Sequence, residues 1–386
     1  MTRIAIVAGE PSGDRIGAGL IKALRAWVPD ASFEGVAGPR MIEAGCKTLY
    51  PMERLAVMGI TEVIRRYREL RTLRDHLACR FAQDAPEVFV GVDAPDFNLG
   101  LAHRLHQKGI RTVQYVSPQV WAWREGRVKR IAQAVDLMLT LFPFEEGFYR
   151  RYDIVAKFVG HPLADEIPLQ VDRTQARCAL GLSEQGPIIA LLPGSRSNEW
   201  HHHTEPFICA AAWCYQREPS LRFIVPSVSR AARGFVERSR DRLAPDLPLA
   251  VFDGRSQTGI AASDVVLTVS GTATLETMLL GKPMVVAYRM GWLSYFVARL
   301  LVKAPFIALP NILAERCLVP ELIQGDVRTW KLGQELLCWL KDRDRAAALQ
   351  GEFKRLHTLL RQSADKRAAQ AIAEMMRAGE AVRRDV

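Results

Sequence analysis

The sequence predicts an α/β protein of two domains, each a parallel β-sheet between layers of helices. The chain has 386 residues, about enough for two hydrophobic cores of ordinary size. Short β-branched runs alternate with helical patterns from the first residues onward, which is typical of buried parallel strands joined by helices. The alternation thins between residues 164 and 186 and then starts again, so two sheets are expected rather than one.

Each expected strand is a short apolar run that precedes a helical pattern. The expected strands are residues 4–8, 33–37, 88–92, 112–116 and 137–141 in the first domain, and 188–192, 223–226, 249–252, 265–269 and 284–287 in the second. Residues 328–382 are expected to be helical. We place the domains at residues 1–170 and 171–386, with C-terminal helices able to pack back on the first domain.

Composition restricts the class of protein without choosing a function. The chain is 49% apolar and 24% charged, as in ordinary globular proteins, and its net charge of +10 suits phosphate-bearing ligands, nucleic acid or an anionic membrane. Seven scattered cysteines without a Cys-x-x-Cys spacing indicate neither a disulfide framework nor a zinc site. The first residues lack the features of a signal peptide, and no apolar run reaches the roughly 18 residues that span a bilayer. We therefore expect a cytoplasmic protein whose membrane contact is peripheral.

Ligands of open α/β sheets bind beyond the carboxyl ends of the strands, so the residues that follow the expected strands are the candidates for a site. After the first strand, residues 9–14 read Gly-Glu-Pro-Ser-Gly-Asp and open a helix. We expect Glu10, Ser12 and Asp14 to bind substrate there. A plain strand-to-helix turn, capped by Ser12 or Asp14, is the alternative.

The third strand ends abruptly in the sequence Asp-Ala-Pro-Asp-Phe-Asn at residues 93–98. A carboxylate at the end of a buried parallel strand is placed to act as general base on an attacking hydroxyl. Asp93 is the preferred base, and Asp96 and Asn98 are expected to bind substrate. The alternative is that Asp96 or Asn98 caps the helix that follows.

Two tryptophans and an arginine follow the fourth strand, in the sequence Ser-Pro-Gln-Val-Trp-Ala-Trp-Arg at residues 117–124. Indole rings stack on sugars or pack in cores, and both interpretations stay open here. We expect Ser117, Trp121 and Arg124 to bind substrate. For the basic residues that begin at Arg124, a solvated helix face is the alternative.

The second domain offers two turns for a diphosphate. Residues 193–199, Pro-Gly-Ser-Arg-Ser-Asn-Glu, follow its first strand, and an arginine there would stabilise a leaving diphosphate through planar bidentate donors; a surface Pro-Gly turn is the alternative. Residues 270–276 start a helix whose N-terminus suits a phosphate, although a capping box explains the same sequence. The expected catalytic residue is Arg196, and the expected substrate-binding residues are Gly194, Ser195, Glu199, Ser270, Gly271, Thr272, Ala273, Thr274 and Glu276.

Three further stretches bear on metal and membrane binding. The run His201-His202-His203 lacks the spacing of helical zinc ligands, so we expect no metal. Residues 55–77 have the pattern of a basic amphipathic helix that meets a membrane surface, although a stripe facing its own sheet gives the same pattern. Residues 292–301 suit either lipid contact or a core. The side chains expected to meet lipid are Ile60, Val63, Ile64, Tyr67 and Leu70.

Taken in order, these motifs resemble those of the lipid-A-disaccharide synthase family. The resemblance spreads over nearly the whole chain, with further matches at residues 35–40, 57–59, 160–162 and 309–311. It implies a GT-B fold, in which two Rossmann-like domains face a cleft, with the family's essential aspartate at Asp93 and the arginine of its Pro-Gly-Ser-Arg turn at Arg196. Asn311 and Glu276 sit at positions that look like parts of the nucleotide-sugar site. The residues after the last expected strand, Tyr288 and Arg289, are counted with the substrate-binding residues.

The resemblance also implies a reaction. Enzymes of this family transfer 2,3-diacylglucosamine from UDP-2,3-diacylglucosamine to 2,3-diacylglucosamine 1-phosphate, which gives UDP and the β-1',6-linked disaccharide 1-phosphate of lipid A. In such an inverting displacement Asp93 takes the proton of the acceptor 6-hydroxyl, while Arg196 and the helix N-terminus at residues 271–272 hold the diphosphate. Asp93 and Arg196 are then expected to face each other across the cleft. The resemblance implies no metal or other cofactor, and a peripheral position on the cytoplasmic face of the inner membrane; a homodimer stays open.

Two other functions fit parts of the same sequence. A different UDP-sugar enzyme of the same fold, such as a peptidoglycan-precursor transferase or a non-hydrolysing epimerase, would share the glycine turns. A basic RNA-binding protein would use the net charge. The chain lacks the interleaved aromatic and basic residues of RNA-binding modules, so no nucleic-acid partner is expected.

Overall fold

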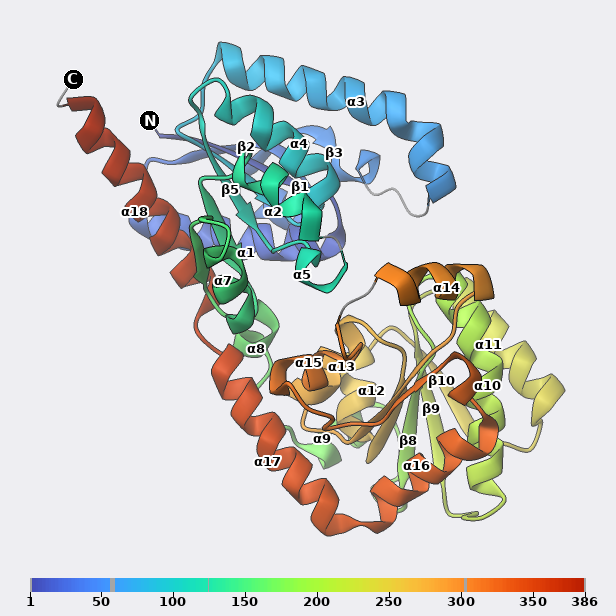
Figure 1. Cartoon of the computed structure of the whole chain (residues 1–386). Coiled ribbons are helices and arrows are strands. Elements are labelled where there is room, and N and C mark those ends of the chain that lie inside the picture. The colour runs from blue at the N-terminus through green and yellow to red at the C-terminus, as the bar shows by residue number, and fades with distance from the viewer. Residues whose placement is uncertain (1, 56–59, 124, 302–303, 385–386) are drawn as a thin grey trace. The chain divides into compact units, whose positions relative to one another are not determined.

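The computed structural model describes residues 2–55, 60–123, 125–301 and 304–384. Its contacts divide the chain into two compact units, Met1–Asp165 with Leu360–Val386, and Glu166–Leu359. We call these the first and the second unit (Figure 1). The chain therefore returns to the first unit for its last helix.

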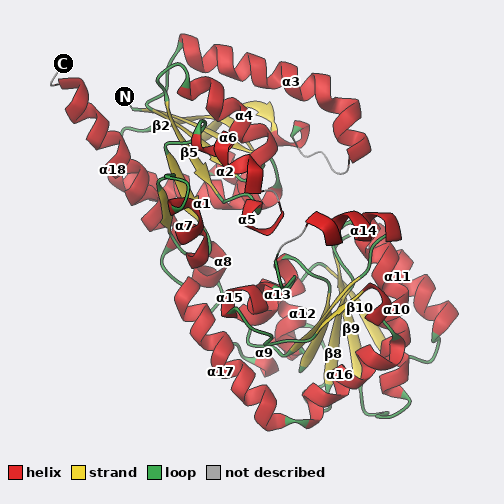
Figure 2. Ribbon diagram, viewed as in Figure 1, coloured by secondary structure: helices red, strands yellow, loops and turns green. Residues whose placement is uncertain are grey.

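The first unit contains a seven-stranded sheet in the order β3-β2-β1-β4-β5-β6-β7, with all neighbouring strands parallel (Figure 2). In chain order its elements are β1 (Arg3–Ala8), α1 (Pro11–Trp27), β2 (Ser32–Ala37), α2 (Pro39–Glu43), β3 (Cys46–Pro51), η1 (Met52–Arg54), α3 (Ile60–Gln83), β4 (Val88–Val92), α4 (Pro95–His106), β5 (Arg111–Tyr115), α5 (Val120–Trp123), η2 (Glu125–Arg127), α6 (Val128–Ala132), β6 (Leu137–Thr140), α7 (Pro143–Arg150), β7 (Ala156–Phe158), α8 (Pro162–Glu166) and α18 (Ala364–Arg384).

The central strands of this sheet are apolar on both faces because helices cover each face. Ile4 and Ile6 of β1 pack in a core with residues of α1 and α18, whereas Val7 packs in a second core with residues of α3 and α4. Successive residues of a strand point to opposite faces, so one apolar run fills both cores. Helix α18 lies against α1 (Figure 1). At its start, the carboxylate of Asp165 accepts backbone N–H groups at 2.9 and 2.6 Å.

The second unit contains a six-stranded sheet in the order β10-β9-β8-β11-β12-β13, again with parallel neighbours. In chain order its elements are α9 (Arg173–Ala179), β8 (Ile188–Leu192), α10 (Ser197–Tyr215), β9 (Arg222–Ser227), α11 (Arg230–Leu243), β10 (Leu249–Asp253), α12 (Ser256–Ala262), β11 (Val265–Thr268), α13 (Thr272–Leu279), β12 (Met284–Tyr288), α14 (Trp292–Leu301), α15 (Leu309–Ala314), β13 (Glu321–Ile323), η3 (Gln324–Asp326), α16 (Thr329–Lys341) and α17 (Arg343–Leu360).

Every strand expected from the sequence is present, and its ends agree to within one residue. Three strands were not expected, namely β3, β7 and β13, and all three lie at the edges of their sheets. Only the first residue of β3 is buried and the others are exposed or half-buried, and β7 and β13 are three residues long and half-buried throughout. An edge strand is covered incompletely, so it lacks the continuous apolar run by which a central strand is recognised.

Each sheet has a point where the chain changes direction across it, between β1 and β4 in the first unit and between β8 and β11 in the second. Ala8 pairs with Val92, and Leu192 pairs with Thr268. The segments that follow these residues therefore leave each sheet side by side. Ligands of open α/β sheets bind outside the carboxyl ends at such switch points. The motifs singled out in the sequence meet there in both units.

Candidate active site

In the first unit the turns after β1 and β4 bring Ser12 to Asp93. The Ser12 hydroxyl donates to Asp93 Oδ2 at 3.2 Å. This approach needs a glycine, because a Cβ at Gly9 would lie 2.7 Å from the Cβ of Ala94. Glu10 stands half-exposed just before α1. The predicted residues Ser12 and Asp93 therefore form one polar group at the edge of the sheet, with Glu10 next to Ser12 in the chain.

The backbone that carries Asp93 is strained. Asp93 and Ala94 have φ angles of 54° and 41°, and Val116, after the neighbouring strand β5, has a φ of 76°. The left-handed region crowds Cβ, most of all in a β-branched residue, and costs about 1–3 kcal/mol for each such residue. Strain of this kind persists where the surrounding structure fixes it, typically at functional sites. The position of the Asp93 carboxylate is thus set by its backbone.

Three other acidic or amide side chains predicted near this turn have different surroundings. Asn98 is fully buried, and its Nδ2 donates to the Asp93 carbonyl at 2.8 Å. Asp96 is exposed in the first turn of α4 and forms an ion pair with Arg127. Asp14 is 3% exposed, and both of its carboxylate oxygens accept backbone N–H groups at the start of α2, at 3.0 Å. Asp14 and Asn98 therefore support the backbone, while Asp96 is accessible.

Ser117 and Trp121 meet a residue that the sequence analysis did not single out. The Trp121 indole N–H donates to Glu145 Oε1 at 3.2 Å, and the hydroxyls of Ser117 and Tyr149 lie 2.8 Å apart. Glu145 is 2% exposed, and burial raises the pKa of its carboxyl to about 7, although hydrogen bonds from the Phe142 backbone, Ser117 and Trp121 oppose the shift. An acid in the first helical turn is ordinarily a capping residue, so only the fold connects Glu145 with Trp121.

The residues predicted to meet lipid lie in α3, and the structure describes the side chains of only some of them. Tyr67 of α3 is 53% exposed, whereas Leu77 is fully buried and Leu70 packs against the same core. The later part of the α3 stripe thus faces its own sheet, as one of the two interpretations held. In the described part of the chain no helix is both long enough and apolar enough to cross a bilayer. The predicted residues that lie outside the described part are Arg124 and the side chains of Ile60, Val63 and Ile64.

In the second unit, backbone N–H groups of the turn after β8 donate to the carboxylate of Glu199, in the helix that follows. Glu199 Oε2 accepts the N–H groups of Ser195 at 3.0 Å and Arg196 at 3.2 Å, and Oε1 pairs with the Arg196 guanidinium at 2.9 Å. Gly194 has a φ of 118°, and a Cβ there would lie 2.3 Å from the Glu199 Cβ. Backbone N–H groups arranged in this way bind anions. In this turn such donors are occupied by the carboxylate of Glu199.

The second turn predicted to bind a phosphate precedes α13, and hydrogen bonds from its own hydroxyl groups hold its backbone. Gly271 has a φ of 137°, and its carbonyl accepts the Thr274 hydroxyl at 2.7 Å. The Ser270 hydroxyl donates to a backbone carbonyl at 2.6 Å, so these two hydroxyls hold the loop. Gly271 and Thr272 are exposed at the start of the helix. Glu276, half-buried one turn later, accepts the Ser256 hydroxyl at 3.4 Å.

Asn311 lies at the start of α15 and is fully buried. Its Oδ1 accepts the N–H groups of Leu318 and Val319 at 2.8 and 2.9 Å. Its Nδ2 donates to the Val319 carbonyl at 2.9 Å and to Glu321 at 2.8 Å. These contacts use the whole amide to fold the loop after α15, so a direct contact of Asn311 with substrate stays a prediction.

His203 connects the turn after β8 with the residue that follows β12. Its Nε2 accepts the Arg289 N–H at 2.7 Å, so Nδ1 carries the proton and donates to the Glu199 carbonyl at 2.7 Å. Burial lowers the pKa of His203, and its ring is tilted against that of Tyr288 at 5.6 Å. From its sequence, the histidine run was weighed only as a metal site, so this contact was not predicted. Among the described residues no three His, Cys, Asp or Glu side chains are grouped to hold a metal ion.

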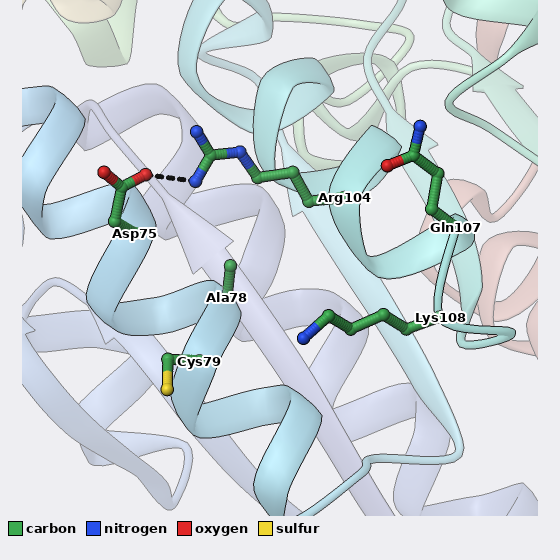
Figure 3. A pocket seen from close by; sticks show the side chains of 6 residues that line it. All are labelled: Asp75, Ala78, Cys79, Arg104, Gln107 and Lys108. Atoms are coloured by element: carbon green, nitrogen blue, oxygen red, sulfur yellow. Dashed lines mark hydrogen bonds and ion pairs between the residues drawn. The ribbon is translucent and has the colours of Figure 1, made fainter.

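A pocket of the first unit lies apart from these turns, at the amino-terminal edge of the sheet. It is lined by side chains from the later part of α3 and from the end of α4, and an ion pair between Asp75 and Arg104 crosses it (Figure 3). Helix α4 starts at the end of β4 and runs back to the start of β5. None of the predicted site residues lines this pocket, so it is separate from the candidate active site.

Comparison with known proteins agrees with this arrangement. A family model described as Lipid-A-disaccharide synthetase matches residues 4–375. The lipid-A-disaccharide synthase of Hahella chejuensis is 47% identical over 383 residues, which cover 99% of this chain and 96% of that protein. Among solved structures, the UDP-GlcNAc 2-epimerase from Neisseria meningitidis bound to UDP-GlcNAc has a TM-score of 0.62 at 10% identity and covers 97% of this chain and 99% of its own. A calicheamicin glycosyltransferase has a TM-score of 0.60 at 14% identity, with 97% and 98% covered.

The two kinds of match carry different information. At such low identity the solved structures show the fold alone, which is the GT-B arrangement of two Rossmann-like domains. The family model and the Hahella relative span nearly the whole chain at an identity that shows common descent. The chain belongs to the lipid-A-disaccharide synthetase family.

Proposed function

We propose that this chain catalyses the reaction for which its family is named. It transfers 2,3-diacylglucosamine from UDP-2,3-diacylglucosamine to the 6-hydroxyl of 2,3-diacylglucosamine 1-phosphate, with inversion at the anomeric carbon. The products are UDP and the disaccharide 1-phosphate of lipid A. The observation that carries this proposal is a carboxylate, Asp93, held by a strained turn at the switch point of a parallel sheet.

In the proposed reaction Asp93 is the general base. It takes the proton of the acceptor hydroxyl as that oxygen attacks the sugar, a role that contributes about 10²–10⁴-fold in rate. The hydroxyl of Ser12 holds Asp93 Oδ2 at 3.2 Å, which orients the carboxylate. Asp96, three residues after Asp93, and Glu10, two residues before Ser12, are candidates for contacts with the acceptor.

The second unit supplies the charge that stabilises the leaving UDP. Diphosphate oxygens would replace the Glu199 carboxylate on the N–H groups of Ser195 and Arg196 and on the Arg196 guanidinium. The exposed N-terminus of α13 at Gly271 and Thr272 adds backbone donors and a favourable helix dipole. Charge that develops on the diphosphate is thus met by donors that are already in place.

The test is product analysis with the full-length protein. UDP-2,3-diacylglucosamine and the monosaccharide 1-phosphate are supplied together, and the product is identified by mass spectrometry. We expect the disaccharide 1-phosphate, and we expect Asp93→Asn to abolish turnover while UDP affinity stays unchanged. A near-normal rate in Asp93→Asn would remove Asp93 from the role of base. Epimerised UDP-sugar formed without any acceptor would favour the epimerase alternative.

We also propose that the protein binds peripherally to the anionic cytoplasmic face of the inner membrane. Tyr67 of α3 is 53% exposed, and Trp292 and Phe296 of α14 are 79% and 58% exposed. Exposed aromatic side chains beside basic ones are typical of helices that lie in a membrane interface. The basic residues with exposed or half-exposed side chains near these aromatics in the chain are Arg66, Arg68, Arg71, Arg289 and Arg299.

Co-sedimentation with vesicles tests the membrane proposal. We expect binding to vesicles that contain phosphatidylglycerol and little binding to phosphatidylcholine alone. The double variant Trp292→Ser, Phe296→Ser should weaken binding, whereas Trp27→Ser, which removes an exposed tryptophan from α1, should not. Equal binding of the wild type, the double variant and Trp27→Ser to the anionic vesicles would contradict a contribution of α14.

A further inference from the structure

A buried glutamine lies between the two strained turns of the first unit. Gln114, the next-to-last residue of β5, is 1% exposed. Its Nε2 lies 3.1 Å from the carbonyl oxygen of Asp93 and 3.3 Å from that of Val116. Both of these residues have left-handed backbones. One side-chain amide therefore reaches both turns from inside the sheet.

The surroundings of Gln114 fit only one orientation of its amide. In the opposite orientation Oε1 would face two carbonyl oxygens, and two acceptors repel each other. Gly91 stands opposite Gln114 in β4, and a Cβ there would lie 2.8 Å from Oε1. Within the described structure Oε1 is buried without a hydrogen-bond partner, which is unfavourable. The hydrogen bonds that Gln114 Nε2 donates are therefore the reason why a polar side chain occupies this buried position.

Asn98 holds the same Asp93 carbonyl from the helix side, with its Nδ2 at 2.8 Å. A carbonyl oxygen has two acceptor lone pairs, and here one amide from α4 and one from β5 use them. The peptide after Asp93 cannot rotate without breaking two buried hydrogen bonds. The backbone conformation at Asp93, and with it the direction of the carboxylate toward Ser12, is held from both sides.

We propose that Gln114 is a positioning residue for the catalytic carboxylate, which it holds in place through the backbone of Asp93. Gln114 is buried and acts through Asp93, so it is not a catalytic residue itself. The inference rests on the proposed role of Asp93 as general base. Loss of the donors of Gln114 should lower kcat by about 10–100-fold, because small displacements of a reacting group have effects of this size. KM for the UDP-sugar should stay unchanged, because the proposed diphosphate contacts are in the second unit.

Two substitutions separate the donor from the shape of the side chain. Gln114→Met keeps the length and loses the donors at every pH. Gln114→Glu can donate one hydrogen bond while its carboxyl is protonated, and none once it is ionised. We expect the activity of Gln114→Glu, relative to wild type, to fall as the pH rises, and the activity of Gln114→Met to be low throughout. Because ionising a buried carboxyl also destabilises the fold, kcat is referred at each pH to the folded fraction, measured by circular dichroism; a purely structural role would leave this kcat independent of pH.

Thr112→Val is the matched control. Thr112 is fully buried in the same strand, and its hydroxyl donates to the Ala134 carbonyl at 2.8 Å, near the opposite end of β5 from the strained turns. The control also replaces a buried polar side chain by an apolar one. We expect Thr112→Val and Gln114→Met to lower the melting temperature, but only Gln114→Met to lower kcat.

The outcomes distinguish this inference from the proposed function. If Gln114→Met retains the wild-type kcat while Asp93→Asn is inactive, Gln114 does not position the base and the proposed function stands. If Asp93→Asn is active, Asp93 is not the base and the role of Gln114 fails with it, whereas the proposed function fails only if the wild-type protein forms no disaccharide 1-phosphate. If Gln114→Met does not fold, Gln114→Glu decides, and an activity ratio that does not change with pH overturns the inference.

Discussion

The two units place their proposed catalytic residues on the same kind of strand-to-helix turn but hold them in different ways. In the first unit the turn after β4 carries Asp93 on a non-glycine residue with a φ of 54°, and buried amides from Asn98 and Gln114 donate to its carbonyl. In the second unit the turn after β8 has a glycine, Gly194, at its left-handed position. There the donors are held by the carboxylate of Glu199.

This difference separates shape from charge. The first turn is fixed by buried contacts between neutral groups, which a ligand leaves in place. The second turn is completed by the negative side chain of Glu199, which is 12% exposed and which a diphosphate of the same sign can replace. We therefore expect the first turn to be sensitive to changes of volume and the second to changes of charge. A rigid carboxylate suits a base that must meet one hydroxyl, and open N–H groups suit a ligand that enters and leaves.

The largest effect is expected for the charge on the second turn. Arg196→Ala removes the guanidinium proposed to stabilise the leaving diphosphate, and we expect kcat to fall by about 10²–10³-fold. Steady-state kinetics with saturating UDP-sugar measures this effect. Arg217→Ala is the control, because it removes an exposed positive charge from the same unit, where Arg217 packs over Trp213. Equal losses in the two variants would mean that net charge, and not the turn, is responsible.

A buried acid in the first unit predicts that the stability of the protein depends on pH. Burial raises the pKa of Glu145 from 4.5 to about 7, so between these pH values the folded chain holds a proton that the unfolded chain has released. The contribution to stability is present below pH 4.5 and is lost as the pH rises through about 7. We expect a total loss of about 3 kcal/mol.

Glu145→Gln should remove this loss, because a neutral amide replaces the titrating carboxyl. Urea unfolding of the variant and the wild type across this pH range measures the difference in stability. Glu146→Gln, at the more exposed neighbouring position, is the control and should leave the pH profile unchanged. If the free energy of unfolding changes with pH in the same way in the wild type and in Glu145→Gln, the effect does not come from Glu145.

The place of both turns could be predicted from the sequence because buried parallel strands are continuous apolar runs, and ligands bind where such strands end. The role of each polar residue could not be predicted in the same way. Asp14, Asn98 and Asn311 lie in the predicted motifs, yet all three are buried and hydrogen-bonded to backbone groups. A polar residue after a strand has the same sequence pattern whether it binds substrate or supports the turn.

Contacts between segments that are far apart in the chain could not be predicted from the sequence, for another reason. Glu145 reaches Trp121, and His203 joins α10 to Arg289. In both cases the partners are far apart in the chain, and neither spacing nor residue type indicates the contact. The edge strands β3, β7 and β13 were missed because partial exposure interrupts their apolar pattern. Sequence patterns therefore located what is locally encoded, and the coordinates were needed for what depends on packing between segments.

A change of volume tests the first turn. A Cβ at Gly91 would lie 2.8 Å from both Gln114 Oε1 and the Asn98 Cβ, so Gly91→Ala should displace the two amides that hold Asp93. We expect kcat to fall by about 10–100-fold and the free energy of unfolding to fall by about 1–3 kcal/mol. Gly147→Ala, where a Cβ meets no atom within 4 Å, should leave kcat unchanged and raise the free energy of unfolding by about 0.5–1 kcal/mol, because Gly147 lies inside helix α7 and alanine favours a helix over glycine. Wild-type kcat in Gly91→Ala would show that the first turn tolerates displacement of its amides.

The smallest effect is expected where charge alone is changed in the second turn. Glu199→Gln keeps an oxygen that can accept the N–H groups of Ser195 and Arg196, but it removes the negative charge that a diphosphate has to displace. We expect UDP to bind about two- to fivefold more tightly, because an ion pair whose arginine is largely exposed, as Arg196 is, contributes only about 0.2–1 kcal/mol. Isothermal titration calorimetry with UDP measures the change, and Glu218→Gln, on the surface of the same unit, controls for net charge. Weaker binding in Glu199→Gln would mean that the carboxylate holds the donors in place for the ligand, and the second turn would then be fixed by its own contacts in the same manner as the first.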